Sequence, residues 1–299
     1  LFFFFFFFFF PSFFFFSFLF FFFFFFFFMY IFIRYQGAGT PAAACGAAAQ
    51  WKLDWQDDFS GTSLGPQWSV YHNCTHGKEA QLYVREGVIV KDGQLTLRAF
   101  KFAHNETSQA GGSYAFGSGW VDTASTRANN ALNDCRSNNT AGYAQQHARW
   151  QVRAKLPPGH FWEAMWQMPD ADMCWPTGGE VDILESDIWG QKPPYKAHAA
   201  YHWSGSSCFA DSSVGAAYNN ATDYSLDFHV FEVQASPRAL VYLVDDLPYY
   251  VATATATENH LPPHPMYLIL GNQLWQGWDY PEELPADFVF DWVKVYLPA

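Results

Sequence analysis

The sequence predicts an all-β domain over residues 51–299, built as an antiparallel sandwich or barrel. Short stretches of alternating apolar and polar residues follow one another from Trp51 onward, separated by Gly, Pro, Asn and Asp turns. No segment shows the periodicity of an amphipathic helix of ordinary length. The roughly 250 residues are enough for one large domain of this class.

Six segments rich in β-branched and aromatic residues are the clearest expected strands. They are residues 88–90, 95–100, 150–156, 230–235, 240–244 and 289–296. Asp92 and Gly93 lie between the first two and predict a tight hairpin turn, because both residue types tolerate a positive φ. Residues 103–141 are polar, small and irregular, so we expect a long loop region there, over one end of the domain.

The start of the chain differs from the rest. Residues 1–33 form a Phe-rich hydrophobic leader that holds 24 of the 34 Phe and is long enough to span a bilayer. It lacks a basic n-region and a cleavage pattern of the usual length, so it is either a corrupted signal peptide or anchor, or a gene-model artefact. Residues 34–50 are rich in Ala and Gly and predict a linker.

The location of the domain is predicted from two opposing signals. As an anchor, the leader would place the residues after Arg34 in the cytoplasm. Four N-glycosylation sequons instead favour an extracellular or cell-wall location, and we expect secretion. They begin at Asn73, Asn105, Asn138 and Asn220.

Three carboxylates, Glu180, Asp182 and Glu185, are threaded through an otherwise apolar run. The apolar residues between them are strand formers, and successive side chains of a strand alternate faces, so Glu180 and Asp182 point the same way. Glu185 would point the other way on a regular strand. A one-residue bulge near Ile183 or Leu184 would return it to the shared face.

Such a row of acids has a specific chemistry. Like charges this close repel, so at least one carboxyl should keep its proton at neutral pH. A protonated acid beside an ionised carboxylate is what glycoside hydrolysis requires, and a retaining enzyme needs about 5–5.5 Å between the two. The alternative is a solvated acidic strand edge. The absence of Lys and Arg between Lys155 and Lys192, and a preceding supply of Trp, weaken that alternative.

With these residues the sequence resembles glycoside hydrolase family 16, which includes laminarinase-like β-glucanases, agarases and carrageenases. The three acids match the bulged signature of the family, Glu-x-Asp-x-x-Glu. Further segments that resemble the family are residues 55–59, 79–83, 92–97, 149–157, 161–166 and 288–296. Lys78, Gln151 and Glu163 depart from its usual Asn, Glu and Pro, which leaves substrate choice open.

The resemblance implies a β-jelly-roll sandwich of two curved antiparallel sheets, with the substrate lying across the concave one. It implies a secreted endo-β-1,3-glucanase that works by double displacement, with mixed β-1,3/1,4-glucan as a further substrate. Glu180 would be the nucleophile and Glu185 the acid and then the base. Asp182 would bind one Glu and keep the two pKa values apart. No cofactor is required for this chemistry.

Sugar-binding residues are expected among aromatic and polar side chains near the acids. A pyranose presents apolar C–H faces that stack on aromatic rings, and its hydroxyls need polar partners. The expected residues are Trp162, Trp166, Trp175, Trp203 and Trp275 as platforms, and His202, Glu79 and Asn272 as polar partners. For any single Trp, a place in the core is the alternative, and His202 has a structural alternative as well.

The sequence contains two candidate metal sites. The resemblance places Asp58, Gly93 and Asp291 where some family members hold a structural calcium, for which oxygen ligands are suited. Ordinary turn residues are the alternative. The spacing of His72, Cys74 and His76 hints at a metal, although a polar loop is favoured.

Five Cys leave one without an intramolecular partner, and their pairing cannot be read from the sequence. We expect Cys174 to pair with Cys208, because both flank the expected cleft.

The net charge of the chain limits the classes of molecule that it is expected to bind. The formal net charge of −12 argues against nucleic acid and weakly against sulfated galactans, so we expect a monomer acting on a neutral β-glucan. An agarase or carrageenase on the same scaffold and a transglycosylase are alternatives within enzymes. A non-catalytic β-glucan-recognition protein is the alternative from another class, and the intact acids speak against it.

Overall fold

The computed structural model describes residues 50–77, 79–125, 135–136, 141–186, 196–219, 222–277 and 284–299. These residues belong to one compact unit, Ala44–Ala299. The expected leader and all but the last residue of the expected linker lie outside the described residues. Within the described ranges, no helix is long and apolar enough to cross a membrane.

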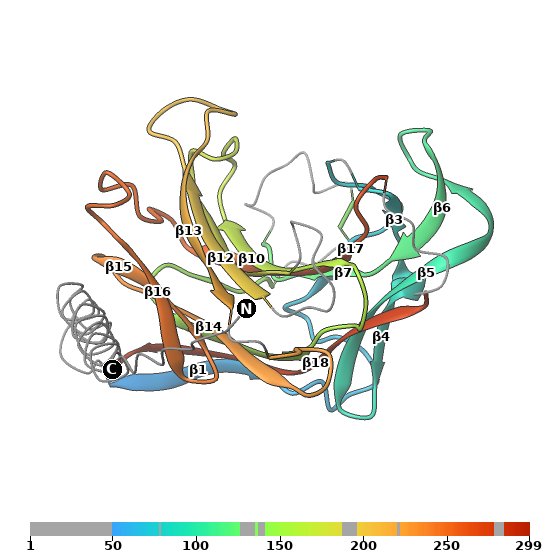
Figure 1. Cartoon of the computed structure of the whole chain (residues 1–299), viewed down its shortest axis with the longest axis horizontal. Helices are drawn as coiled ribbons and strands as arrows, with labels where there is room; N and C mark the ends of the chain where they lie inside the picture. The colour runs from blue at the N-terminus through green and yellow to red at the C-terminus, as the bar shows by residue number, and fades with distance from the viewer. Residues whose placement is uncertain are drawn as a thin grey trace, which may run out of the picture. The chain divides into compact units, whose positions relative to one another are not determined.

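The strands of this unit form two layers (Figure 1). The first layer is a ten-stranded sheet in the order β16-β15-β14-β9-β18-β5-β6-β3, with β1 beside β18 and β4 beside β5. Its strands are β1 (Trp51–Asp57), β3 (Gln81–Tyr83), β4 (Val88–Lys91), β5 (Gln94–Thr107), β6 (Ser113–Ser118), β9 (Arg149–Lys155), β14 (His229–Ala235), β15 (Ala239–Val244), β16 (Leu247–Thr253) and β18 (Ala286–Pro298).

The second layer is an eight-stranded sheet in the order β13-β12-β11-β10-β17-β7-β2, with β8 beside β17. Its strands are β2 (Ser69–Val70), β7 (Trp120–Asp122), β8 (Ala144–Gln145), β10 (Trp162–Pro169), β11 (Glu180–Glu185), β12 (Lys196–Trp203), β13 (Ser212–Asn219) and β17 (Met266–Gln273). Within the described part of the chain, strand pairs are antiparallel apart from β3 with β6. The predicted all-β sandwich is therefore confirmed.

The main hydrophobic core lies between the two sheets. The eight-stranded sheet supplies Val181, Leu184 and Leu268, and the ten-stranded sheet supplies residues such as Val152 and Phe288. Burial of these apolar side chains is the main force that holds the layers together. Residues that alternate with them in the eight-stranded sheet point to its other face, which bears the site described below.

The six predicted strands are all present, and five have bounds within three residues of those expected, whereas β5 runs seven residues further, to Thr107. The predicted turn is also confirmed, because Asp92 and Gly93 have φ values of 55° and 74°. The loop expected over residues 103–141 is wrong in part, since β5 continues to Thr107 and is followed by β6 and β7.

One small residue in β6, Gly117, is explained by packing. A Cβ at Gly117 of β6 would lie 2.6 Å from the Phe100 ring and 2.7 Å from the Phe102 ring. The strand therefore carries Gly where propensity alone would argue against a strand.

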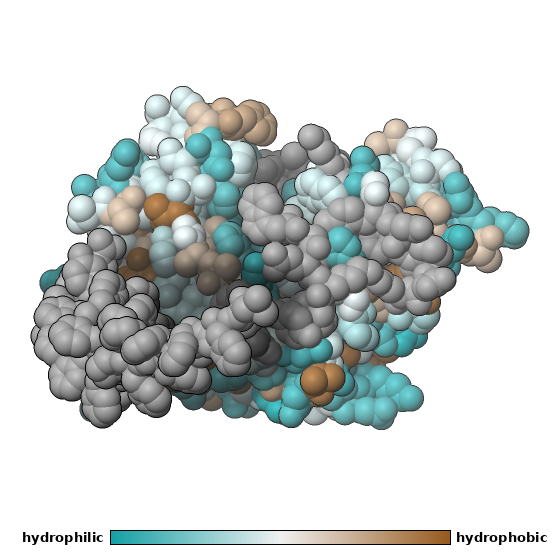
Figure 2. All heavy atoms as spheres, viewed as in Figure 1, coloured by the Kyte–Doolittle hydropathy of each residue, from teal (hydrophilic) through white to brown (hydrophobic). Residues whose placement is uncertain are grey.

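The coloured part of the surface in Figure 2 is mainly hydrophilic, and its hydrophobic residues form small separated spots. Large hydrophobic side chains that are exposed among the described residues are Leu53, Phe209, Leu226 and Leu247.

Candidate active site

A β-bulge in β11 brings the three acids to one face of the sheet. Against β10, Leu184 pairs with Met165 and Asp182 pairs with Trp166, so Ile183 has no partner in that register. Against β12, the register shifts between Asp182 and Glu185. The predicted bulge is therefore confirmed. We call the face that carries Glu180, Asp182 and Glu185 the acid face.

The cause of the bulge is visible in the sequence. Ile183 and Leu184 are successive apolar residues, and both enter the inter-sheet core, with exposures of 1% and 0%. A regular strand can bury only one of two neighbours on one side. The extra residue lets both enter the core and turns Glu185 outward.

Burial and mutual repulsion hold a proton within the acid row. Burial, and then the Asp182 charge, raise the pKa of Glu180 to about 8. Burial, and then the Glu185 charge, raise the pKa of Asp182 to about 7. The two groups titrate as a coupled set, so near neutral pH the row retains at least one proton. The expected retained proton is thus favoured at Glu180 and Asp182, whereas the resemblance assigns the acid role to Glu185, so the division of roles stays a prediction.

Indole N–H groups bind both outer acids. Trp175 Nε1 donates to Glu180 Oε2, and Trp162 Nε1 donates to Glu185 Oε1 at 3.1 Å. The Trp275 ring lies edge-on to the Trp162 ring, with centroids 4.9 Å apart. Trp162 and Trp175 therefore contact the acids directly, Trp275 contacts Trp162, and each of the three rings is partly exposed. Their use as sugar platforms stays a prediction.

His202 links the acid row to a neighbouring loop. Its Nε2 lies 3.3 Å from Asp182 Oδ2, and its Nδ1 lies 3.0 Å from both carboxylate oxygens of Asp211. Burial disfavours the charged ring, but contacts with Asp182, Glu180 and Asp211 outweigh it and raise the pKa of His202 to about 10. The charged imidazole faces Glu180 across the β11–β12 pair.

Sequence reasoning missed two members of this group. Asp211 lies in a loop before β13, and its spacing from His202 carries no signal. His198 does carry one, because it precedes His202 by four residues on the same strand and so points to the same face. Its Nδ1 lies 3.9 Å from Glu185 Oε2.

Several predicted sugar-binding residues lie elsewhere. Trp203 belongs to the inter-sheet core and stacks on Tyr201, because it is adjacent to His202 and therefore faces the other way. Asn272 is fully buried and donates to Leu97 O and Ala286 O of the opposite sheet. Both predictions were wrong.

Two others are on the acid side but buried. Trp166 is 5% exposed and packs edge-on against Trp120, so it supports the face rather than offering a platform. Glu79 is 2% exposed, accepts a hydrogen bond from Gln81 Nε2 and lies 3.6 Å from His76 Nδ1. Little of either side chain is left for a sugar.

The expected metal residues have other partners. Asp291 pairs with Arg153, and Asp58 accepts from the backbone N–H of Ser60. Calcium binding at Asp58, Gly93 and Asp291 stays a prediction. In the described part of the chain, no three His, Cys, Asp or Glu side chains are grouped to hold a metal.

Two disulfides tie loops to the site. Cys174 pairs with Cys208, as predicted, and Cys74 pairs with Cys135. The second bond rules out Cys74 as a metal ligand with His72 and His76. Cys45 lies outside the described residues.

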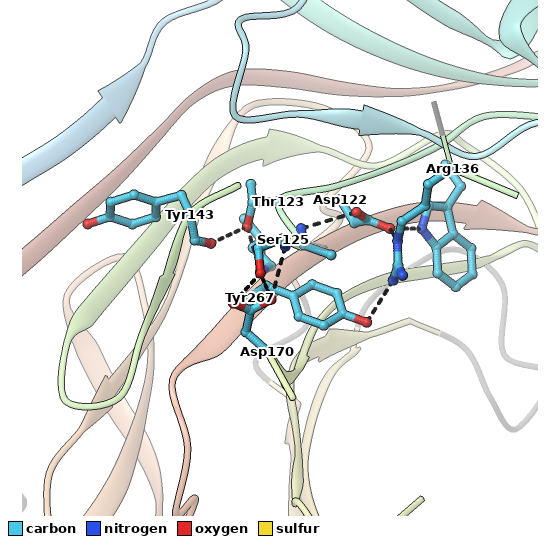
Figure 3. A network of polar contacts seen from close by, with 10 residues as sticks. Asp122, Thr123, Ser125, Arg136, Tyr143, Asp170 and Tyr267 are labelled. Atoms are coloured by element: carbon cyan, nitrogen blue, oxygen red, sulfur yellow. Dashed lines mark hydrogen bonds and ion pairs between the residues drawn. The ribbon is translucent and has the colours of Figure 1, made fainter. Parts of the chain in front are cut away.

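A polar network supports the acid face from β7 and β17 (Figure 3). Asp122 is fully buried and accepts from Arg136 Nε at 2.8 Å, while Arg136 Nη2 donates to the Tyr267 hydroxyl at 2.9 Å. Trp120 Nε1 also donates to Asp122. The network fixes Trp120, and through it Trp166, beneath the acids.

A β-sandwich that sets a proton-holding acid row among indole rings is the arrangement of a glycoside hydrolase. The sequence model of "Glycosyl hydrolases family 16" matches residues 80–294, and the chain belongs to this family. The glucan endo-1,3-beta-glucosidase of Cryptopygus antarcticus is 28% identical over 212 residues, which cover 68% of this chain and 70% of that protein. The beta-glucanase of Rhodothermus marinus is 26% identical over 273 residues, covering 83% and 86%.

The fold is also that of solved structures. The catalytic domain of an endo-1,3-beta-glucanase (laminarinase) from Thermotoga petrophila superposes with a TM-score of 0.69 at 24% identity, covering 84% of this chain and 99% of that one. The likeness confirms the predicted jelly-roll sandwich.

Proposed function

We propose that the protein is an endo-acting hydrolase of β-1,3-glucan that retains configuration by double displacement. The observation that carries the proposal is the bulge, which gives Glu180, Asp182 and Glu185 a common face. The β-1,3-glucan specificity follows the name of the relative from Cryptopygus antarcticus, and the relative from Rhodothermus marinus is named a beta-glucanase. Mixed β-1,3/1,4-glucan is a further expected substrate.

In the first step the Glu180 carboxylate attacks the anomeric carbon while Glu185 gives its proton to the departing glycosidic oxygen. An ester between Glu180 and the sugar results. In the second step Glu185 takes a proton from water, the water oxygen attacks the same carbon, and Glu180 is released.

The contacts of Glu180 support its role as nucleophile. The attack requires an ionised carboxylate, although burial favours the neutral one. The Trp175 N–H and the charged His202 ring both stabilise the anion. Asp182 holds His202 next to Glu180, so it acts by positioning a charge.

The test separates the two roles by azide rescue of alanine variants with an aryl β-1,3-gluco-oligosaccharide. Glu180→Ala should lose activity by several orders of magnitude and regain it with azide as an α-glycosyl azide, because azide replaces the nucleophile. Glu185→Ala should keep a fast first step with a good leaving group and yield a β-glycosyl azide. Glu86→Gln, which removes an exposed carboxylate, is the control.

Substrate class is tested by sizing the products from laminarin, lichenan, agar and carrageenan. Internal cleavage of laminarin supports the proposal. Cleavage of the galactans alone would replace it with an agarase or carrageenase, and binding of laminarin without cleavage would replace it with a recognition protein.

We also propose an extracellular location. Two disulfides are typical of proteins that fold in an oxidising compartment, and the Asn105 sequon is exposed near the end of β5. Intact mass under non-reducing conditions should show both bonds in protein exported from a host cell. Free thiols at Cys74 or Cys174 would count against this location.

A further inference from the structure

Phe209 is the most exposed large hydrophobic side chain among the described residues, at 82%. A single exposed hydrophobic residue is ordinary and by itself needs no explanation. The backbone of Phe209 is not ordinary, because its φ is 62°. A bulky L-residue rarely adopts this left-handed conformation, and such outliers persist only where the surrounding structure enforces them.

Two bonds enforce the position of Phe209. The preceding residue, Cys208, is covalently bonded to Cys174. The Phe209 N–H donates to the carbonyl oxygen of Trp175 at 2.8 Å. Two successive residues, Cys208 and Phe209, are thus bonded to two other successive residues, Cys174 and Trp175.

Trp175 connects this anchor to the acid row. Its indole donates to Glu180, and its ring lies 6.1 Å from the His202 ring, measured between centroids. The loop of Phe209 returns to the same group at Asp211, two residues later, which binds His202. Phe209 is therefore held next to Trp175, between two residues, Cys208 and Asp211, that are themselves bonded to Cys174 and His202.

We propose that Phe209 forms an additional sugar-binding subsite, on which a glucose unit of a bound glucan chain stacks beyond the Trp175 position. The proposal rests on the proposed function and extends it to substrate length. The C–H face of a pyranose stacks on a flat aromatic ring, while the sugar hydroxyls at its edge stay in contact with water. When a glucan chain extends past the acids, its further glucose units can contact side chains at the border of the site, including Phe209.

A subsite of this kind acts only on substrates that reach it. The substitution Phe209→Ala should lower kcat/KM about three- to tenfold on laminarin and on long laminari-oligosaccharides, the range expected for one aromatic stacking contact. Cleavage of the shortest oligosaccharide that the enzyme accepts should not change. Phe209→Trp should restore the long-chain value, because it keeps a flat apolar ring.

The matched control is Leu226→Ala. Leu226 is 79% exposed, nearly as much as Phe209, and lies in the segment before β14 rather than at the acid row. Leu226→Ala should leave kcat/KM unchanged on both short and long substrates. An equal loss on short and long chains with Phe209→Ala would overturn the subsite, because it would show that the residue only supports Trp175. No loss on any chain length would overturn it too.

Binding without turnover distinguishes this proposal from the proposed function. Electrophoretic retardation by laminarin is compared between the Glu180→Gln protein and the same protein with Phe209→Ala. If the wild-type protein does not cleave laminarin, the proposed function fails, yet weaker retardation of the double variant would still support the subsite. Unchanged retardation would overturn the subsite even where laminarin is cleaved.

Discussion

The Arg136–Asp122 pair allows a sharp test of how the acid face is supported. The two side chains are 5% and 0% exposed, and their closest atoms are 2.8 Å apart. Arg136→Met keeps much of the side-chain volume but leaves the Asp122 carboxylate buried. Among the described residues its remaining donors are the weaker Trp120 Nε1, at 3.3 Å, and Ala124 N, at 3.2 Å. Breaking a buried pair in this way costs about 3–5 kcal/mol.

The assay is thermal unfolding by near-ultraviolet circular dichroism with the disulfides kept oxidised. For a domain of this size, each kcal/mol shifts Tm by about 2–4 °C, so Arg136→Met should lower Tm by roughly 10 °C. The double variant Arg136→Met, Asp122→Asn should recover part of the loss, because it removes the unpaired charge. Arg98→Met breaks an exposed pair with Asp287, 40% and 37% exposed, and should cost less than about 1 kcal/mol.

The reasoning would be refuted by a shift of less than about 2 °C for Arg136→Met. It would also be refuted by a double variant no more stable than the single one, because that result would locate the loss in packing rather than in charge.

Three further predictions concern β11 and its neighbours. Trp175→Phe removes the indole donor to Glu180. Because a hydrogen bond to a charged group contributes about 1.5–3 kcal/mol, kcat/KM should fall roughly 10- to 100-fold with the fold unchanged. A fall of less than about threefold would show that the bond does not assist catalysis. The raised pKa of Glu180 makes the native state hold its proton more tightly than the unfolded one, so wild-type stability declines as pH rises from 4.5 to about 8. Glu180→Gln does not titrate, so the Tm of this variant relative to wild type should increase over that range, and a constant difference would contradict the shift. Gly179→Ala should lower Tm more than Gly277→Ala, because both positions have positive φ but only the Cβ at 179 would meet another group, the Tyr201 hydroxyl at 2.7 Å; equal effects would exclude the clash.

The acid row could be predicted because its geometry is local. Strand periodicity places Glu180 and Asp182 together, and two adjacent apolar residues require the bulge that adds Glu185. The same rule could have excluded Trp203, because a residue next to His202 on a strand points into the core. The alternation of side chains along the strand was therefore sufficient to place Trp203 in the core.

Other parts of the site depend on contacts that no local pattern encodes. Asn272 is buried, and its side-chain amide donates to Leu97 O and Ala286 O of the opposite sheet. These two acceptors lie on strands β5 and β18, so no pattern around Asn272 in the sequence reveals the contacts. Asp211 reaches His202 only through the path of a loop that the Cys174–Cys208 bond holds. Within residues 103–141, packing explains the glycine in β6, because a Cβ at Gly117 would meet the Phe100 and Phe102 rings. Strand β7 was missed although Trp120 and Val121 are strand formers.

The irregularity at Ile183 separates the spacing of the acids along the sequence from their spacing on the sheet. Loss of one residue between Asp182 and Glu185 would remove the bulge and leave Glu185 two positions after Asp182, which is the same face of a regular strand. The interior would then lose one of the two apolar side chains that Ile183 and Leu184 supply. Such a deletion should therefore lower stability while it keeps the three carboxylates together.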